Sequence, residues 1–303
     1  MNRPSQSQTK NQDHLIWDLG KRHLSFGERP LVMGILNVTP DSFSDGGKHF
    51  SVENAVDAAF RMEDQGAAII DIGGESTRPY SDPVDSEEEM RRVLPVIEAI
   101  TSRLTIPISI DTSKADVAEA AVNAGAEIIN DVTGLEGDPR MLSVASECKV
   151  GVCVMHMKGT PQTMQNQPQY KNVVQEIHEY LLARLKHCVT NGIKPERVCL
   201  DPGIGFGKTH EHNIELVRNA NRFLETGRPI LVGHSRKGFI GNLLGDKEAD
   251  RTAATLGVSL ALASKGVHLL RVHDVGWTVD AIKLFKTSIG GVNNLASEKS
   301  QQA

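Results

Sequence analysis

The chain of 303 residues has few aromatic side chains, few cysteines and no long hydrophobic run. Aromatic residues make up only 4% of the sequence, so a core must be built mainly from Ile, Val, Leu and Ala. The longest apolar stretch, residues 253–263, is too short to span a bilayer, and residues 1–13 lack the apolar segment of a secretory signal. We therefore expect no membrane partner.

The charge and the cysteine pattern of the sequence exclude further classes of partner and site. The net charge is −5 and no long Lys/Arg run offsets it, which argues against a nucleic-acid partner. The four cysteines form no Cys-x-x-Cys pair and have no histidine at metal-ligand spacing, so buried reduced thiols are favoured over a zinc site or disulfides. These features predict a protein of a reducing compartment, the cytoplasm.

What the chain does have is eight short apolar runs, each ending in a polar residue. The segments between them have helical periodicity. Eight strand-like runs that alternate with helices are typical of a (β/α)₈ TIM barrel, whose chemistry lies at the C-terminal ends of the strands. The polar endings are therefore the candidate site. The runs are residues 32–37, 67–76, 108–113, 128–132, 152–157, 198–203, 230–237 and 269–275.

The domain organisation follows from this pattern. We expect a single barrel domain over residues 14–290, between a disordered N-terminus (1–13) and a flexible tail (291–303). Residues 14–28 alternate around an Asp-Leu-Gly-Lys turn, which predicts a β-hairpin before the first barrel strand. Long loops should follow the first, second and fifth strands, at residues 39–50, 76–85 and 158–170.

Helix boundaries have their own signals. Ser86 with Glu89 has the spacing of a capping box and predicts a helix start there. Four glycines are expected to end helices just before a strand, because glycine enters the left-handed region cheaply: Gly66, Gly125, Gly192 and Gly266.

Three familiar motifs are near misses. DPGIGFGKT (201–209) departs from the Walker phosphate loop at Pro202 and from the dinucleotide fingerprint at Lys208. GHSRK (233–237) departs from the nucleophile elbow because Lys237 replaces its final glycine. Nucleotide-binding and hydrolase functions are therefore disfavoured.

The polar endings themselves suggest a ligand. Asp111, Asn130 and Asp201 would converge on the barrel mouth, where two carboxylates and an amide suit a flat heterocycle with adjacent N–H donors. Lys237 and Arg271 would supply donors and a stacking plane. Arg271 with His273 would hold an anion. The alternative for each residue alone is a solvated ion pair at the barrel rim.

The chain resembles the dihydropteroate synthase family. The similarity lies in eight blocks, in the family's order: GILNVTPDSFSDGG (34–47), DIGGESTRP (71–79), IDTSKADVAEAA (110–121), NDVTG (130–134), MHMKGTPQTMQ (155–165), DPGIGFGK (201–208), GHSRKGFIG (233–241) and RVHDV (271–275). The resemblance implies a pterin-binding TIM barrel of folate biosynthesis, a sulfonamide target. Such enzymes condense 6-hydroxymethyl-7,8-dihydropterin diphosphate with p-aminobenzoate to 7,8-dihydropteroate and release diphosphate.

The resemblance also implies roles for particular residues. Asn37 would be a ligand of Mg²⁺, the implied cofactor, and Asp45 would stabilise a cation-like pterin in an SN1-type reaction without a covalent enzyme intermediate. The implied protein is a homodimer. The implied catalytic residues are Asn37, Asp45, Lys237, Arg271 and His273. The implied pterin site is Asp111, Asn130, Met155, Asp201, Phe206, Lys237 and Arg271; the diphosphate site is Asn37, Arg271 and His273; and the p-aminobenzoate site is Phe43, Thr77, Arg78, Pro79 and Gly238.

Two residues depart from the family pattern, and one stays without a role. Gly238 replaces a frequent serine and Tyr80 a usual glycine, so both changes fall on the p-aminobenzoate half of the site. His156 has no implied role, whereas its neighbour Met155 has one. Two other functions stay open: a corrinoid-linked methyltetrahydrofolate methyltransferase, and a paralogue that binds pterins without catalysis.

Overall fold

The computed structural model describes residues 15–39, 52–77 and 81–289. Its centre is a parallel sheet of eight strands in the order β8-β7-β6-β5-β4-β3-β10-β9, and a bridge between Leu200 and Ile230 joins the two outer strands into a barrel. The predicted TIM barrel is confirmed. The strands are β3 (Leu31–Asn37), β4 (Ile69–Gly73), β5 (Ile108–Asp111), β6 (Ile128–Asp131), β7 (Gly151–Met155), β8 (Val198–Asp201), β9 (Leu231–Gly233) and β10 (Leu269–Val272).

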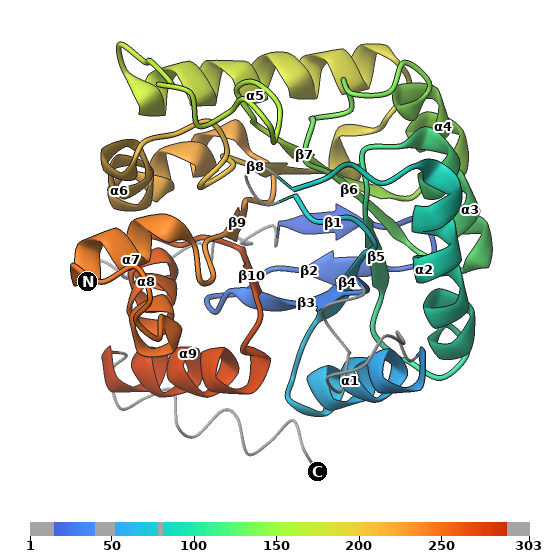
Figure 1. The fold of residues 1–303 in the computed structure, drawn as a ribbon, viewed down its shortest axis with the longest axis horizontal. Helices are drawn as coiled ribbons and strands as arrows, with labels where there is room; N and C mark the ends of the chain where they lie inside the picture. Colours follow the sequence, from blue (N-terminus) through green and yellow to red (C-terminus); the bar gives the residue numbers. More distant parts are fainter. Residues whose placement is uncertain (1–14, 40–51, 78–80, 290–303) are drawn as a thin grey trace, which may run out of the picture.

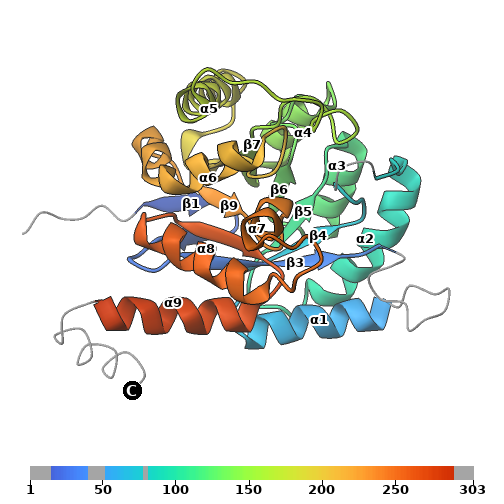
Figure 2. The same cartoon turned by 60° about the vertical axis from the view of Figure 1, so that its left-hand side comes forward.

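Helices surround this barrel (Figure 1), and a second view shows α7 in front of the strands (Figure 2). None of the helices in the described ranges is long and apolar enough to cross a membrane. The helices are α1 (Val52–Asp64), α2 (Ser86–Ile100), α3 (Ala115–Ala124), α4 (Met141–Cys148), α5 (Val173–Thr190), α6 (His210–Arg218), α7 (Gly238–Leu244), α8 (Thr252–Ser264) and α9 (Val275–Ile289), with 3₁₀ turns at η1 (Pro195–Arg197) and η2 (Ala220–Thr226).

The strand residues alternate between two cores. Outward-facing side chains pack under the helices, as Val32, Ile70 and Leu270 do. Inward-facing side chains form an apolar layer across the lower barrel, composed of Met33, Ile69, Ile128, Cys153, Cys199, Leu231 and Leu269. Because side chains alternate along a strand, the next inward layer comes two residues later, nearer the C-terminal mouth.

The predicted N-terminal hairpin is confirmed and closes the lower end of the barrel. β1 (Ile16–Asp18) and β2 (His23–Ser25) pair antiparallel. Trp17 is fully buried in the apolar layer, and its indole N–H donates to the Arg197 carbonyl at 2.8 Å. Gly151 allows this approach, since a Cβ there would lie 2.4 Å from Leu19. The hairpin therefore plugs the N-terminal end of the barrel, and the polar strand ends face the opposite mouth.

Several local predictions can be compared with the structure. All four predicted helix-ending glycines have positive φ, between 80° and 124°. Residues 158–170 contain no helix or strand, as expected. The predicted capping box is wrong: Asp85 is the N-cap of α2 and its side chain accepts from the Glu88 N–H at 2.8 Å, while Glu89 turns inward. The proposed domain boundaries fall at or next to residues outside the described ranges, and they stay predictions.

Candidate active site

A polar layer lies directly above the apolar layer inside the barrel. Asp71 follows Ile69 by two residues, and Arg271 follows Leu269 in the same way, so both face inward. The same parity brings in Asp111 from β5, Asn130 from β6 and Asp201 from β8. Gly233 holds the inward position on β9 beside Arg271 and leaves room for its side chain. The polar layer therefore places three carboxylates, those of Asp71, Asp111 and Asp201, near the Arg271 guanidinium.

Arg271 lies between two of these carboxylates. Its Nε donates to Asp71 Oδ2 at 2.5 Å, and its Nη2 donates to Asp111 Oδ2 at 2.6 Å. Asn130 completes the group, because its amide donates to the same Asp71 oxygen at 3.1 Å. Burial raises the pKa of Asp111, although Arg271 opposes that shift. The guanidinium is thus fixed in orientation by a pair of carboxylates that strands β4 and β5 hold.

Asp201 and Lys237 form the other side of the layer. Asp201 Oδ1 accepts from the Gly203 N–H at 2.7 Å, and burial raises the pKa of this carboxyl. Lys237 Nζ lies 4.3 Å from the centre of the Phe206 ring and donates to the Ile204 carbonyl. Burial lowers the pKa of Lys237 to about 7, and Asp201 opposes the shift. This ammonium therefore changes charge near neutral pH.

An apolar cluster adjoins the polar layer. Met155, at the end of β7, is buried together with Phe206 from the loop after β8. Val132 and Met164 pack with them, and Met157 is partly buried against the group. Carboxylates and an amide on one side, with thioethers and a phenyl ring on the other, suit a flat heterocycle that has a polar edge and an apolar face.

Two further predicted residues lie at the rim of the mouth. β10 pairs with β3 so that Val272 is opposite Gly34, which places His273 and Asn37 beyond the polar layer. His273 Nδ1 lies 3.0 Å from Ser235 Oγ, in the loop between β9 and α7. The rim therefore offers an imidazole and an amide to whatever leaves or enters the barrel.

The predicted p-aminobenzoate residues are only partly described. Thr77 lies in the second loop, and Gly238 is the first residue of α7, directly after Lys237. A Cβ at Gly238 would meet no described atom within 4 Å, so the missing serine leaves open space. Phe43, Asp45, Arg78 and Pro79 lie outside the described residues, as does the unusual Tyr80.

Two site residues were missed from the sequence. Asp71 holds Arg271, as described above. Lys208 is buried, donates to the Phe206 carbonyl at 2.8 Å and lies 3.0 Å from His156 Nδ1. Burial lowers the pKa of Lys208 well below its usual range and that of His156 to about 3. The His156 ring also packs edge-on against Tyr180, and its backbone N–H donates to the Asp201 carbonyl at 3.0 Å, which gives this residue a structural place.

Comparison with known proteins identifies the family. Residues 33–273 match the pterin binding enzyme family. The dihydropteroate synthase of Escherichia coli (strain K12) is 46% identical over 265 residues, which cover 88% of this chain and 94% of that protein.

Two solved structures of Xanthomonas albilineans dihydropteroate synthase superpose closely on the barrel. The complex with 4-aminobenzoic acid has a TM-score of 0.84 at 44% identity, over 91% of this chain and 98% of that one. The complex with 7,8-dihydropteroate has a TM-score of 0.80 at 42% identity, over 90% and 98%. Since sequence and structure agree over nearly the whole barrel, the chain belongs to the pterin binding enzymes, in the dihydropteroate synthase family.

Proposed function

We propose that this chain condenses 6-hydroxymethyl-7,8-dihydropterin diphosphate with p-aminobenzoate to form 7,8-dihydropteroate and diphosphate, the reaction of its family. One observation of the site supports this most directly. Asp111 Oδ1 is buried and has no hydrogen-bond donor among the described residues, although its other oxygen binds Arg271. A buried carboxylate oxygen without a donor is costly, so a ligand N–H is the partner that this site is built to receive.

The polar layer fits the pterin ring edge. The 2-amino group and ring N–H of a pterin form a guanidine-like pair of donors, which Asp111 and Asp201 can accept, with Asn130 between them on β6. Lys237 supplies a donor to the ring oxygen or nitrogen. We assign Met155 and Phe206, which are buried together, to the apolar face of the ring, and the Arg271 guanidinium to stacking on the ring.

The rim residues suit the diphosphate. We assign His273, Arg271 and Asn37 to it, since cationic and amide donors neutralise the charge that develops on a leaving phosphate. Among the described residues, no three His, Cys, Asp or Glu side chains are grouped to hold a metal. Mg²⁺ is commonly held by one or two protein oxygens plus substrate phosphates, so the Asn37 amide oxygen fits an ion that arrives with the diphosphate. Bound there, Mg²⁺ would stabilise the leaving group.

The chemistry then needs no protein nucleophile. The bond between the pterin methylene carbon and the diphosphate oxygen breaks, and its electron pair leaves with the diphosphate. The p-aminobenzoate nitrogen donates its lone pair to the methylene carbon and loses a proton. We assign Asp45 to stabilising the cation, and Phe43, Thr77, Arg78, Pro79 and Gly238 to holding p-aminobenzoate and excluding water, which would otherwise trap the cation.

An activity assay tests this function. The purified chain, with Mg²⁺ and the dihydropterin diphosphate, is expected to release diphosphate only when p-aminobenzoate is present, with one dihydropteroate formed per diphosphate. Chromatography of the product with a diphosphate assay measures both. Pterin binding without product at saturating p-aminobenzoate would instead identify a binding protein. Methyl transfer from methyltetrahydrofolate to a corrinoid would identify the methyltransferase alternative.

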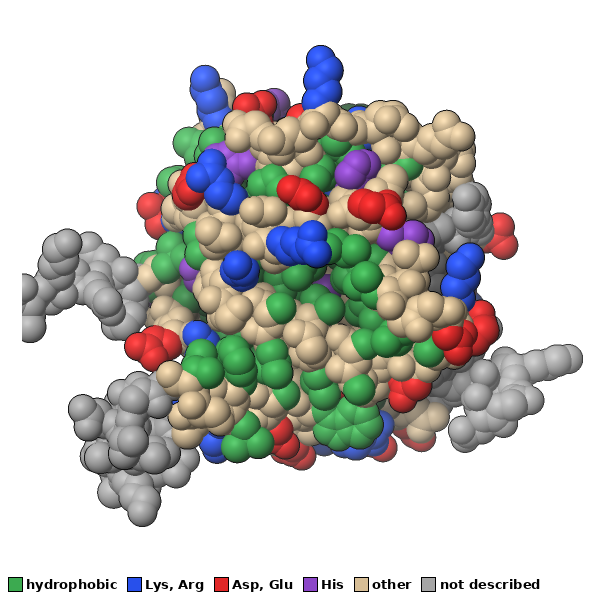
Figure 3. Space-filling view, turned by 90° about the vertical axis from the view of Figure 1, so that its left-hand side faces the viewer, with side chains coloured by type: hydrophobic (Ala, Val, Ile, Leu, Met, Phe, Trp, Pro, Cys, Tyr) green, Lys and Arg blue, Asp and Glu red, His purple; other side chains and the backbone are tan. Residues whose placement is uncertain are grey.

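Exposed apolar side chains support a homodimer. Leu243 and Leu244 on α7 are 59% and 48% exposed, and Leu284 on α9 is 67% exposed. Hydrophobic side chains gather on the face that includes these helices (Figure 3). The small residues Ala253, Gly257 and Ala261 lie exposed along α8 between them. We propose that a second copy of the chain covers this face, because monomers rarely leave such patches in water.

Light scattering after size exclusion is expected to give twice the 33.0 kDa mass of one chain. Leu243→Glu should shift the protein toward monomers, because a charge would be buried at the interface. Leu182→Glu is the matched control, an exposed leucine on α5 far from this face. A wild-type mass of one chain would refute the dimer. We also propose a cytoplasmic location, since all four cysteines are free thiols.

A further inference from the structure

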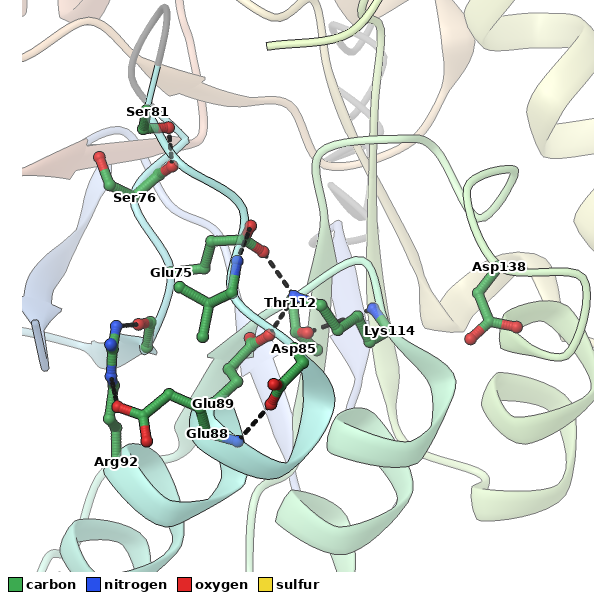
Figure 4. Close-up of polar contacts among 12 residues, drawn as sticks. Glu75, Ser76, Ser81, Asp85, Glu88, Glu89, Arg92, Thr112, Lys114 and Asp138 are labelled. Carbon is green, nitrogen blue, oxygen red and sulfur yellow. Dashed lines mark hydrogen bonds and ion pairs between the residues drawn. The ribbon is translucent and has the colours of Figure 1, made fainter. Parts of the chain in front are cut away.

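The base of the second loop is tied to the barrel by one lysine. Lys114 Nζ lies 2.5 Å from Glu75 Oε2 and 2.5 Å from Glu89 Oε2 (Figure 4). Glu75 begins the loop after β4, Glu89 lies in the first turn of α2, and Lys114 follows the end of β5. We call these three residues the loop latch. It joins three segments that are far apart in the sequence.

The same glutamate closes the loop on itself. Glu75 Oε1 accepts the Val84 N–H at 3.1 Å, so the outgoing and returning ends of the loop meet at one carboxylate. Ser81 Oγ donates to the Ser76 carbonyl and adds a second link between the two ends. Arg92 of α2 donates to the Gly74 carbonyl at 2.7 Å. Gly74, Glu75 and Ser76 therefore each bind either α2 or the returning end of the loop.

Burial argues that the latch is not simply a stabilising ion pair. The Glu89 side chain is fully buried, and burial raises the pKa of its carboxyl, although Lys114 opposes that shift. An acidic residue in a first helical turn interacts favourably with the helix dipole when exposed, at no desolvation cost. Burying a carboxylate with an ammonium gains little stability over an apolar pair. The ion pair between Glu89 and Lys114 does fix the position of Lys114, and Lys114 in turn fixes the position of Glu75.

The latch lies next to both halves of the site. Lys114 comes three residues after Asp111, whose carboxylate faces the pterin pocket, on the turn that leads from β5 into α3. On the loop side, Ser76 and Thr77 line the same pocket as Val132 and Met157. These two belong to the apolar cluster of the site. The position of the loop base therefore sets one wall beside the pterin.

We propose that Lys114 is a positioning residue for the second substrate: through Glu75 it fixes the loop base so that Thr77 is held where p-aminobenzoate binds. This inference rests on the function proposed above. Lys114 touches no substrate in this scheme. Its loss should therefore weaken the use of p-aminobenzoate and leave the pterin site, which the barrel strands build, in place.

Steady-state kinetics separate these effects. Lys114→Met is expected to raise the KM for p-aminobenzoate by about tenfold and to change the KM for the dihydropterin diphosphate by less than about twofold, because small displacements of positioning groups reduce the effective concentration of a bound reactant. Glu75→Gln should also raise the KM for p-aminobenzoate, whereas Lys114→Arg should keep this KM close to that of the wild type. Arg140→Met is the control, since Arg140 pairs with Asp116 on the exposed side of α3. Equal changes in both KM values, or none, would overturn the proposal.

Hydrogen exchange tests the latch without activity. The Val84 amide donates to Glu75, so its protection should fall in Lys114→Met, where Glu75 loses its ion-pair partner, and persist in Arg140→Met. Unchanged protection at Val84 would refute the latch even in an active enzyme. Lys114→Met leaves the Glu89 carboxylate buried without its cation, which could unfold the protein. Lys114→Met/Glu89→Met removes this buried carboxylate as well and loses the same contact with Glu75. Failure of the wild type to form product would refute the proposed function alone.

Discussion

Lys237→Met is expected to weaken binding of the dihydropterin diphosphate by about 100-fold, the loss typical of removing one partner from a buried charge-assisted contact. The lysine Nζ lies 4.3 Å from the centre of the Phe206 ring and interacts with the charge of Asp201, so its loss removes a cationic donor from this side of the polar layer. Methionine has a similar length and fills the same space. The fold should persist, because burying an ammonium costs free energy that the variant no longer spends.

Isothermal titration calorimetry with the dihydropterin diphosphate, in the absence of p-aminobenzoate, measures this effect. The matched control is Lys158→Met. Lys158 is an exposed lysine of the loop after β7, and its Nζ lies 4.3 Å from the Tyr170 ring centre, the same distance as that from Lys237 to Phe206. It should bind pterin as the wild type does. Equal affinities for the wild type and Lys237→Met would show that Lys237 does not bind the pterin ring.

The pH dependence gives an independent signature of the same ammonium. Since the pKa of Lys237 is about 7 in the free protein, pterin affinity should fall by up to tenfold per pH unit above pH 7. Burial also raises the pKa of Asp111 to about 7, so protonation of this acceptor should weaken pterin binding below pH 7. Stability has the opposite trend: between pH 7 and the usual lysine pKa the unfolded chain holds a proton that the folded chain lacks, so the free energy of unfolding rises with pH. Lys237→Met should lose the fall in pterin affinity above pH 7 and this rise in the free energy of unfolding.

Strand parity explains how much of the site was predictable. The sequence located Asp111, Asn130 and Asp201 because each stands at the end of a short apolar run. Asp71 has the same inward parity, two residues after Ile69, but its run continues through two glycines to Glu75 and Ser76. The polar ending there belongs to the loop. The hydrogen bonds that Asp71 accepts from Arg271 and Asn130, on other strands, show that this aspartate lies inside the barrel.

Other features depend on contacts that a single sequence does not contain. Asp85 and Ser86 are both good N-cap residues, and the choice between them is made by Glu89, which turns toward Lys114 instead of back to the helix start. Lys208 is buried because His156 and two backbone carbonyls converge on its Nζ, and those partners come from two different loops. The spacing of residues along the sequence does not show which side chains and carbonyls from different loops meet in the fold.

Asp71→Ala is expected to lower the free energy of unfolding by about 3–5 kcal/mol, the cost of breaking a buried ion pair by removing one partner. Asp71 is fully buried and is bonded to both Arg271 and Asn130, so its removal leaves a guanidinium with one carboxylate and an amide without its acceptor. Urea denaturation measures the change. Asp116→Ala is the control, because Asp116 forms an exposed pair with Arg140 and such pairs contribute little.

A double-mutant cycle distinguishes this pairing from a general packing defect. Arg271→Leu should also destabilise, and Asp71→Ala/Arg271→Leu should cost clearly less than the sum of the two single changes, because each single change already removes the contact between Asp71 and Arg271 and it can be lost only once. Additive losses would show that the two side chains are independent, contrary to the 2.5 Å contact between them. Because Asp71 fixes the plane of Arg271, Asp71→Ala should also weaken pterin binding although Asp71 contacts Arg271 and Asn130 rather than the pterin. The aspartate that is hardest to recognise in the sequence would then determine how the pterin pocket presents its arginine.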